Sequence, residues 1–142
     1  MSDPMNDEQR ALLMTKNAGS TLQAVCHAFA YGAGWWHDLS TGEDMTTRKS
    51  EKPKRNVGEL LCLVHSEISE AMEGHRKGKM DEHIPGRLSM EVELADCVIR
   101  IADLCGGLGL DLGGAIADKL AYNAARADHR PENRRADGGK KF

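Results

Sequence analysis

Aromatic residues are scarce in this chain of 142 residues, at 4% of the composition, and Val, Ile and Thr do not gather in alternating runs. This shortage disfavours strands, whereas the abundant Ala, Leu, Glu, Met and Arg favour helices. No apolar run approaches the roughly 20 residues of a membrane-spanning helix, and the polar N-terminus is unlike a signal peptide. We therefore expect an all-α protein, a bundle of four to five helices with no membrane partner.

Strong charge of one sign is missing as well. The formal net charge is −3, whereas a dedicated nucleic-acid-binding protein is usually basic, so no stable nucleic-acid partner is expected. Cysteine pairs with Cys-x-x-Cys spacing are also absent, because the four cysteines are scattered. Such scattered residues are typical of reduced thiols in a helical core, and we expect a cytoplasmic protein.

Several well-known catalytic motifs are absent from the sequence. There is no Gly-x-x-x-x-Gly-Lys loop, which excludes a P-loop enzyme, and no His-Glu-x-x-His zinc pattern. A ferritin-like di-iron bundle needs Glu-x-x-His twice, and the acidic pairs described below lack the histidine.

Capping residues and glycines divide the chain into four expected helices within a single domain of residues 1–142. Ser20 with Gln23 and Asn56 with Glu59 are N-terminal capping patterns, and glycines or Pro131 follow the helix ends. The predicted helices begin at Ser20, Asn56, Ser89 and Asp111, and end near Gly32, Gly74 to Gly78, Cys105 and Arg130. The intervening parts are predicted to be a loose N-terminal arm (1–17), a mobile basic loop (39–55) and a basic tail (131–142).

Hydrophobic periodicity predicts which faces of these helices are buried. In the second helix the expected core stripe is Leu60, Leu61, Val64, Ile68, Ala71 and Met72. The third helix carries two apolar rows with a narrow polar row between them. A helix that is apolar over so much of its girth is expected either centrally or at a subunit interface.

Two pairs of carboxylates carry the most chemical information. Glu67 and Glu70 lie three residues apart on the second helix, off its apolar stripe, and Glu93 and Asp96 repeat this spacing on the third. Positions i and i+3 share a helix face, so neighbouring helices would bring four carboxylates together. Such a cluster requires cations, and an oxygen-only ligand set suits Mg²⁺ or Mn²⁺. The alternative for each pair is an ordinary solvated surface.

Two further groups are candidates for contacts with a nucleotide. Lys119, Asn123 and Arg126 follow one face of the fourth helix and could hold phosphate oxygens, although the same spacing also suits a solvated stripe. Trp35 and Trp36 could stack on a nucleobase, with His37 supplying hydrogen bonds; the alternative is that at least one tryptophan fills the core.

With these residues in place, the chain resembles the MazG-like nucleoside triphosphate pyrophosphohydrolases of the all-α NTP pyrophosphatase superfamily. The family pattern is Glu-Glu-x-x-Glu on one helix and Glu-x-x-Asp on the next. This sequence has Ser66-Glu67-Ile68-Ser69-Glu70 and then Glu93-Leu94-Ala95-Asp96. Ser66 therefore stands where the family pattern has its first Glu. The likeness extends from about Val57 to the end of the fourth helix.

The resemblance implies a set of roles for these residues. Glu67, Glu70, Glu93 and Asp96 would bind Mg²⁺, with Glu67 or Glu70 accepting the proton of the attacking water. The α–β phosphoanhydride of a nucleoside triphosphate would be cleaved to the monophosphate and pyrophosphate by a homodimer or homotetramer. The residues expected to bind the triphosphate are Lys119, Asn123 and Arg126. Two alternatives stay open: a non-catalytic helical interaction module, and a dUTPase-like or nucleotide-sugar hydrolase of the same superfamily.

Overall fold

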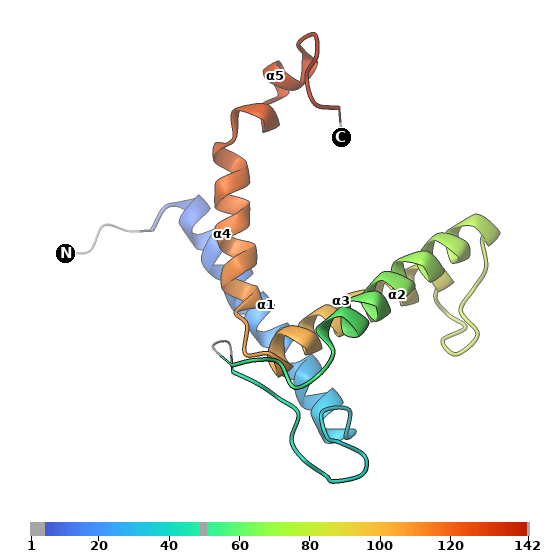
Figure 1. The fold of residues 1–142 in the computed structure, drawn as a ribbon. Helices are drawn as coiled ribbons and strands as arrows, with labels where there is room; N and C mark the ends of the chain where they lie inside the picture. Colours follow the sequence, from blue (N-terminus) through green and yellow to red (C-terminus); the bar gives the residue numbers. More distant parts are fainter. Residues whose placement is uncertain (1–4, 49–50, 142) are drawn as a thin grey trace. The chain divides into compact units, whose positions relative to one another are not determined.

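The structure, a computed structural model, describes residues 5–48 and 51–141, and in this part of the chain all regular secondary structure is helical (Figure 1). The all-α prediction is confirmed for these residues. The only β-type pairing among them consists of two isolated bridges, His37 with Asp44 and Met80 with Leu88. The helices are α1 (Asp7–Gly32), α2 (Val57–Lys77), α3 (Ser89–Gly107), α4 (Leu112–Ala125), the 3₁₀ turn η1 (Ala127–His129) and α5 (Pro131–Arg135).

The chain falls into two units, residues 22–111 and residues 1–21 with 112–142. The prediction of one domain over residues 1–142 stays a prediction. Among the helices that the structure describes, none combines the length and hydrophobicity that crossing a membrane requires.

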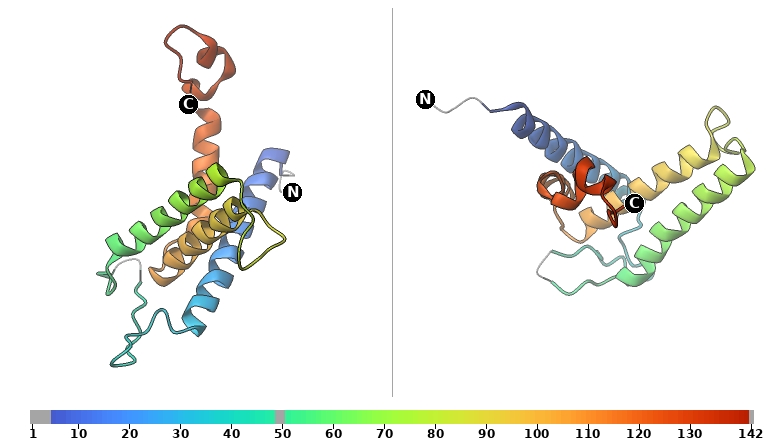
Figure 2. Two further views of the ribbon diagram at one scale, coloured as in Figure 1. Left: turned by 90° about the vertical axis from the view of Figure 1, so that its right-hand side faces the viewer. Right: turned by 90° about the horizontal axis from the view of Figure 1, so that it is seen from above.

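The ends of α2 follow from its capping residues. The side-chain oxygen of Asn56 accepts a hydrogen bond from the backbone N–H of Glu59, as the sequence predicts. Gly78 closes the helix in the left-handed conformation, with φ of 60°, which glycine adopts without a steric penalty. The connection from residue 78 to 88 then returns the chain to α3, which lies side by side with α2 (Figures 1 and 2).

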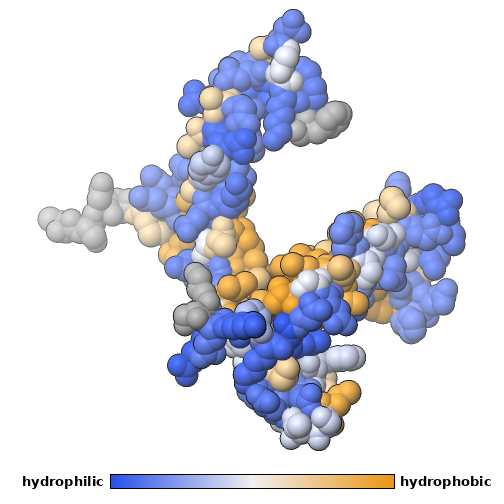
Figure 3. All heavy atoms as spheres, viewed as in Figure 1, coloured by the Kyte–Doolittle hydropathy of each residue, from blue (hydrophilic) through white to orange (hydrophobic). Residues whose placement is uncertain are grey.

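The face of α2 that packs against α3 differs from the predicted stripe. The buried residues of α2 are Glu67, Ala71 and Gly74, whereas Ile68 and Met72 are 45% and 67% exposed. Small residues allow close approach of the helices: a Cβ atom at Gly74 would lie 2.9 Å from the backbone nitrogen of Met90. The predicted stripe is thus wrong for Leu61, Ile68 and Met72, although Ala71 belongs to the buried row. Hydrophobic side chains consequently gather on the visible surface of these two helices in Figure 3.

Two other boundaries are corrected by the structure. Helix α1 begins at Asp7, so residues 7–17 are helical and the expected loose arm is wrong there. The reason is a reciprocal cap, in which the Asn6 and Gln9 side chains each accept a hydrogen bond from the other's backbone N–H. At the other end of the chain, α4 stops at Ala125, five residues before the predicted end, because Arg126 is extended.

The segment after α1 packs against the end of α3. Trp36 is fully buried against Leu104 and Leu108 and forms the centre of this core. Gly107 makes room for it, since a Cβ atom there would lie 2.1 Å from the indole ring. The backbone N–H of Thr47 donates to the Gly107 carbonyl at 2.8 Å, so the described start of the expected mobile loop is held against α3.

Candidate metal centre

Three of the four predicted carboxylates meet between α2 and α3. Glu67 from α2 and Glu93 and Asp96 from α3 each offer one carboxylate oxygen, and these oxygens lie within 4.8 Å of one another. We call these three residues the carboxylate triad. Glu70, one turn beyond Glu67, is exposed and is not part of this group.

The packing of α2 explains why Glu67 is buried. Glu67, Ala71 and Gly74 follow one another at spacings of four and three and therefore lie on one face. That face packs closely on α3, so the Glu67 side chain is only 7% exposed. A carboxylate removed from water requires a cation or hydrogen-bond donors nearby.

Arg100 supplies this partner in the structure. Its Nε donates to Oε1 of Glu67 at 2.7 Å, while 45% of the Arg100 side chain stays exposed. No functional motif in the sequence includes Arg100. The signal was present, because Arg100 follows Asp96 by four residues and Glu93 by seven, and so lies on the same face of α3.

The electrostatics of the triad favour a bound cation. The pKa of Glu93 is raised, chiefly because partial burial disfavours its charged form and then because Glu70, Glu67 and Asp96 are negatively charged neighbours. Glu70 thus contributes to the field of the triad although its oxygens lie outside it. A divalent cation would relieve this repulsion.

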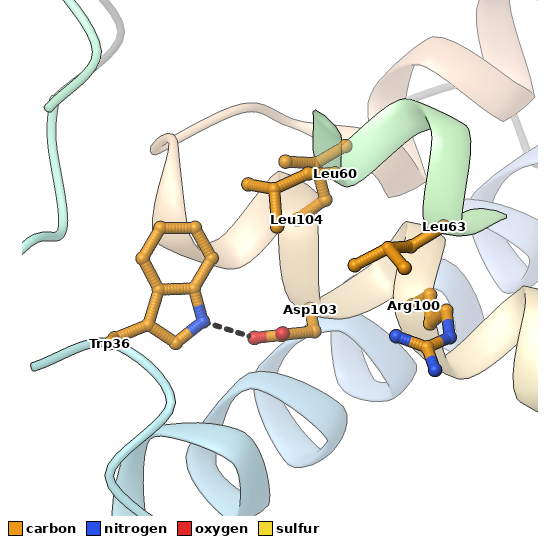
Figure 4. A pocket seen from close by; sticks show the side chains of 6 residues that line it. All are labelled: Trp36, Leu60, Leu63, Arg100, Asp103 and Leu104. Carbon is orange, nitrogen blue, oxygen red and sulfur yellow. Dashed lines mark hydrogen bonds between the residues drawn. The ribbon is translucent and has the colours of Figure 1, made fainter. Parts of the chain in front are cut away.

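A cavity of about 330 Å³ adjoins the triad. Asp96 belongs both to the triad and to the lining of this cavity. A smaller pocket of about 40 Å³, lined by Trp36 among others, shares four lining residues with it (Figure 4). The walls of the larger cavity combine an indole face and aliphatic side chains with two guanidinium groups and two carboxylates. The lining residues are Ala30, Trp35, Arg55, Leu60, Leu63, Asp96, Ile99, Arg100 and Asp103.

The two tryptophans have different environments. Trp35 is 70% exposed and lines the cavity, so its ring is accessible to a ligand. Trp36 has no exposed surface, and its Nε1 donates to Oδ1 of Asp103 at 2.7 Å (Figure 4). Nδ1 of His27 lies 2.9 Å from the same oxygen. The predicted base-stacking role is therefore wrong for Trp36, which is a core residue.

His37, the third residue predicted to contact a base, lines a second cavity. Its ring lies 4.7 Å from that of Tyr31, measured between centroids, and its backbone pairs with Asp44. The cavity has a volume of about 440 Å³ and shares Trp35 and Arg55 with the first, but contains no member of the carboxylate triad.

The residues predicted to bind phosphate belong to the unit of residues 1–21 and 112–142, whereas the triad belongs to the unit of residues 22–111. Lys119 and Arg126 both lie over the ring of Tyr122, at 4.8 and 5.7 Å from its centroid. Arg126 also forms a two-point ion pair with Asp128, which raises the pKa of its guanidinium. The side-chain oxygen of Asn123 is buried and finds no hydrogen-bond partner within residues 5–48 and 51–141.

Comparison with known proteins yields no match, whether the chain is set against protein families, curated proteins or solved structures.

Proposed function

We propose that the chain is a Mg²⁺-dependent nucleotide pyrophosphohydrolase of the MazG-like, all-α NTP pyrophosphatase type. It would cleave the α–β phosphoanhydride of a (d)NTP to the nucleoside monophosphate and pyrophosphate. The observation that carries this proposal is the carboxylate triad, with its oxygens within 4.8 Å of one another beside a cavity that shares Asp96.

The ligand set suits the proposed metal ion. All three donors are carboxylate oxygens, which Mg²⁺ and Mn²⁺ prefer. Glu67, Glu93 and Asp96 would hold the ion between α2 and α3, where their oxygens already lie within 4.8 Å of one another. A bound Mg²⁺ would neutralise phosphate charge and lower the pKa of a coordinated water molecule.

Glu70 is the better candidate for accepting the proton of the attacking water. Glu67 is buried and paired with Arg100, whereas Glu70 is exposed one turn away and forms no ion pair within the described residues. Its negative charge acts on Glu93, so it lies close to the triad. We therefore assign Glu67 to metal binding and Glu70 to proton transfer.

The cavity beside the triad is the proposed site for the nucleobase and sugar. Its volume of about 330 Å³ lies within the range of small-molecule sites, and its walls combine five apolar residues with four charged ones. The exposed indole of Trp35 offers a stacking face to any base. Arg55 and Asp103 lie in the same wall and can donate to and accept from the polar edge of a base.

Lys119, Asn123 and Arg126 are proposed to bind phosphate oxygens. The Lys119 ammonium and the Arg126 guanidinium both lie over the ring of Tyr122, so two positive charges lie close together. The side-chain oxygen of Asn123 is buried and has no hydrogen-bond partner among the described residues. Release of Arg126 from Asp128 would make its two-point donor geometry available to a phosphate.

The experiment is a panel of NTPs, dNTPs, dUTP and nucleotide sugars incubated with the protein and Mg²⁺, with release of pyrophosphate or phosphate measured and the products identified. Pyrophosphate together with a nucleoside monophosphate is the expected result. Cleavage of a nucleotide sugar alone would assign the chain to the alternative hydrolase class. No turnover and no Mg²⁺-induced rise in melting temperature would favour a non-catalytic interaction module.

A further inference from the structure

Arg100 is the one positively charged side chain that pairs with the carboxylate triad in the described part of the chain. Its Nε lies 2.7 Å from Oε1 of Glu67, an oxygen in a side chain that is 7% exposed. A buried carboxylate without a partner is costly, so the metal-free protein needs a cation at this position. Arg100 meets this need from within the chain.

We propose that Arg100 is a tethered counter-ion for Glu67, which a divalent metal ion displaces when it binds the carboxylate triad. This inference rests on the proposed function, because it takes the triad to be the metal site. It goes beyond that function by assigning a residue that controls how readily the metal binds.

Simultaneous occupation by both cations is unfavourable. A guanidinium at hydrogen-bond distance from Glu67 and a divalent ion bound to the same carboxylate would lie only a few ångströms apart, with little water between them. Like charges repel strongly at such a distance in a partly buried site. One of the two cations must therefore give way.

The structure indicates which side chain moves. Glu67 is held in the contact between α2 and α3, whereas 45% of the Arg100 side chain is exposed and can rotate without disturbing the helices. Arg100 also lines the cavity beside the triad, together with Asp103 one turn further along α3 (Figure 4). The displaced guanidinium therefore remains in the wall of the proposed nucleotide site.

The first measurement is the affinity for Mg²⁺ and Mn²⁺, determined by titration calorimetry without nucleotide. Arg100→Met keeps the unbranched stem and removes the charge. The matched control is Arg87→Met, because Arg87 pairs with the exposed Glu91 and not with the triad. We expect Arg100→Met to bind the metal about tenfold more tightly than the wild type, the factor that corresponds to 1.4 kcal/mol. Arg87→Met should bind it as the wild type does.

The second measurement follows the Nε–Hε signal of Arg100 in the wild-type protein by ¹⁵N nuclear magnetic resonance, assigned by its absence from Arg100→Met. Mg²⁺ should shift this signal and speed its exchange with water as the hydrogen bond to Glu67 breaks. This measurement is made on the wild-type protein, and Arg100→Met is needed only to assign the signal.

The outcomes separate this inference from the proposed function. If the wild type binds Mg²⁺ while Arg100→Met binds it equally or more weakly, the counter-ion role is wrong and the metal site stands. An unchanged Arg100 signal at saturating Mg²⁺ would likewise overturn displacement. If neither the wild type nor any variant binds Mg²⁺ or Mn²⁺, the proposed function fails, and the inference fails with it.

Discussion

Asp96 is the residue at which the two parts of the proposed active site meet, because it belongs to the carboxylate triad and also lines the cavity. Asp96→Asn preserves the size of the side chain and removes the charge that a metal ion requires. We expect Mg²⁺-dependent pyrophosphate release to fall by roughly 10²-fold or more, as when a group that stabilises transition-state charge is removed. Far-ultraviolet circular dichroism should be unchanged.

A suitable control for this substitution is Glu91→Gln. Glu91 also lies on α3 but is exposed and pairs with Arg87. The activity of the Glu91→Gln variant should match that of the wild type. Full activity in Asp96→Asn would show that the carboxylate triad does not take part in the reaction.

The adjacent tryptophans provide a second test at the residue scale. Trp35→Ala should weaken nucleotide binding with little change in stability, because its ring is largely exposed. Trp36→Ala should lower the free energy of unfolding by about 3–5 kcal/mol, since it leaves a large cavity and removes one of the two hydrogen-bond partners of Asp103. Urea unfolding and nucleotide titration of both variants measure the two effects. Equal losses of stability would contradict the assignment.

Residue-level prediction from the sequence succeeds where spacing along one helix is sufficient. Helical spacing places Glu93 and Asp96 on one face, and the same rule applies to Arg100. The tryptophan pair could not be resolved in this way. Which of the two is buried depends on Asp103 and Gly107, more than 65 residues away in sequence, and no local pattern encodes that contact.

At the scale of elements, capping residues predicted the limits of α2 better than hydrophobicity predicted its buried face. Ile68, in the predicted stripe, lies roughly a quarter of a turn from the row of Glu67, Ala71 and Gly74, at about 100° per residue. The small residues of that row permit close packing on α3, which outweighs the larger apolar area of the stripe. Hydrophobic periodicity identifies the most apolar face of a helix, but it does not register that small residues let two helices pack closely.

The loop after α1 offers a pH-dependent test. Oδ1 of Asp38 accepts hydrogen bonds from the backbone and hydroxyl groups of Ser40 and Thr41, which lower the pKa of Asp38 to about 2. The stabilisation is therefore present above the ordinary pKa of 3.8 and is lost as the pH falls toward 2.

Asp38→Ala should accordingly melt at a lower temperature than the wild type at pH 7, and the difference should shrink as the pH falls toward 2. Thermal melts from pH 2 to pH 7 measure this difference. Asp137→Ala serves as the control because it removes a carboxylate from the other unit of the chain. A pH-independent difference for Asp38→Ala would show that the carboxylate charge does not stabilise the loop.

At the scale of the whole molecule, α2 and α3 expose a set of large apolar side chains. Leu61, Ile68 and Met72 on α2, with Leu94 and Val98 on α3, are each more than 40% exposed. We propose that a second copy of the chain covers them, in the homodimer or homotetramer that the sequence resemblance implies. Clusters of this kind mark interaction surfaces more often than free surface.

Ile68→Glu should therefore yield monomers, because it places a charge in the centre of the proposed interface. Ile68→Leu keeps the apolar contact and should preserve the oligomer. Light scattering coupled to size-exclusion chromatography gives the mass of each. A monomeric wild type would contradict the proposed interface.

A divalent ion bound between α2 and α3 is central to the proposed function. The most direct measurement is an anomalous difference map from crystals of the protein soaked in Mn²⁺. We predict a peak within coordination distance of Glu67, Glu93 and Asp96. A map with Mn²⁺ bound only elsewhere, or with no peak at a concentration that saturates the protein in solution, would contradict the account.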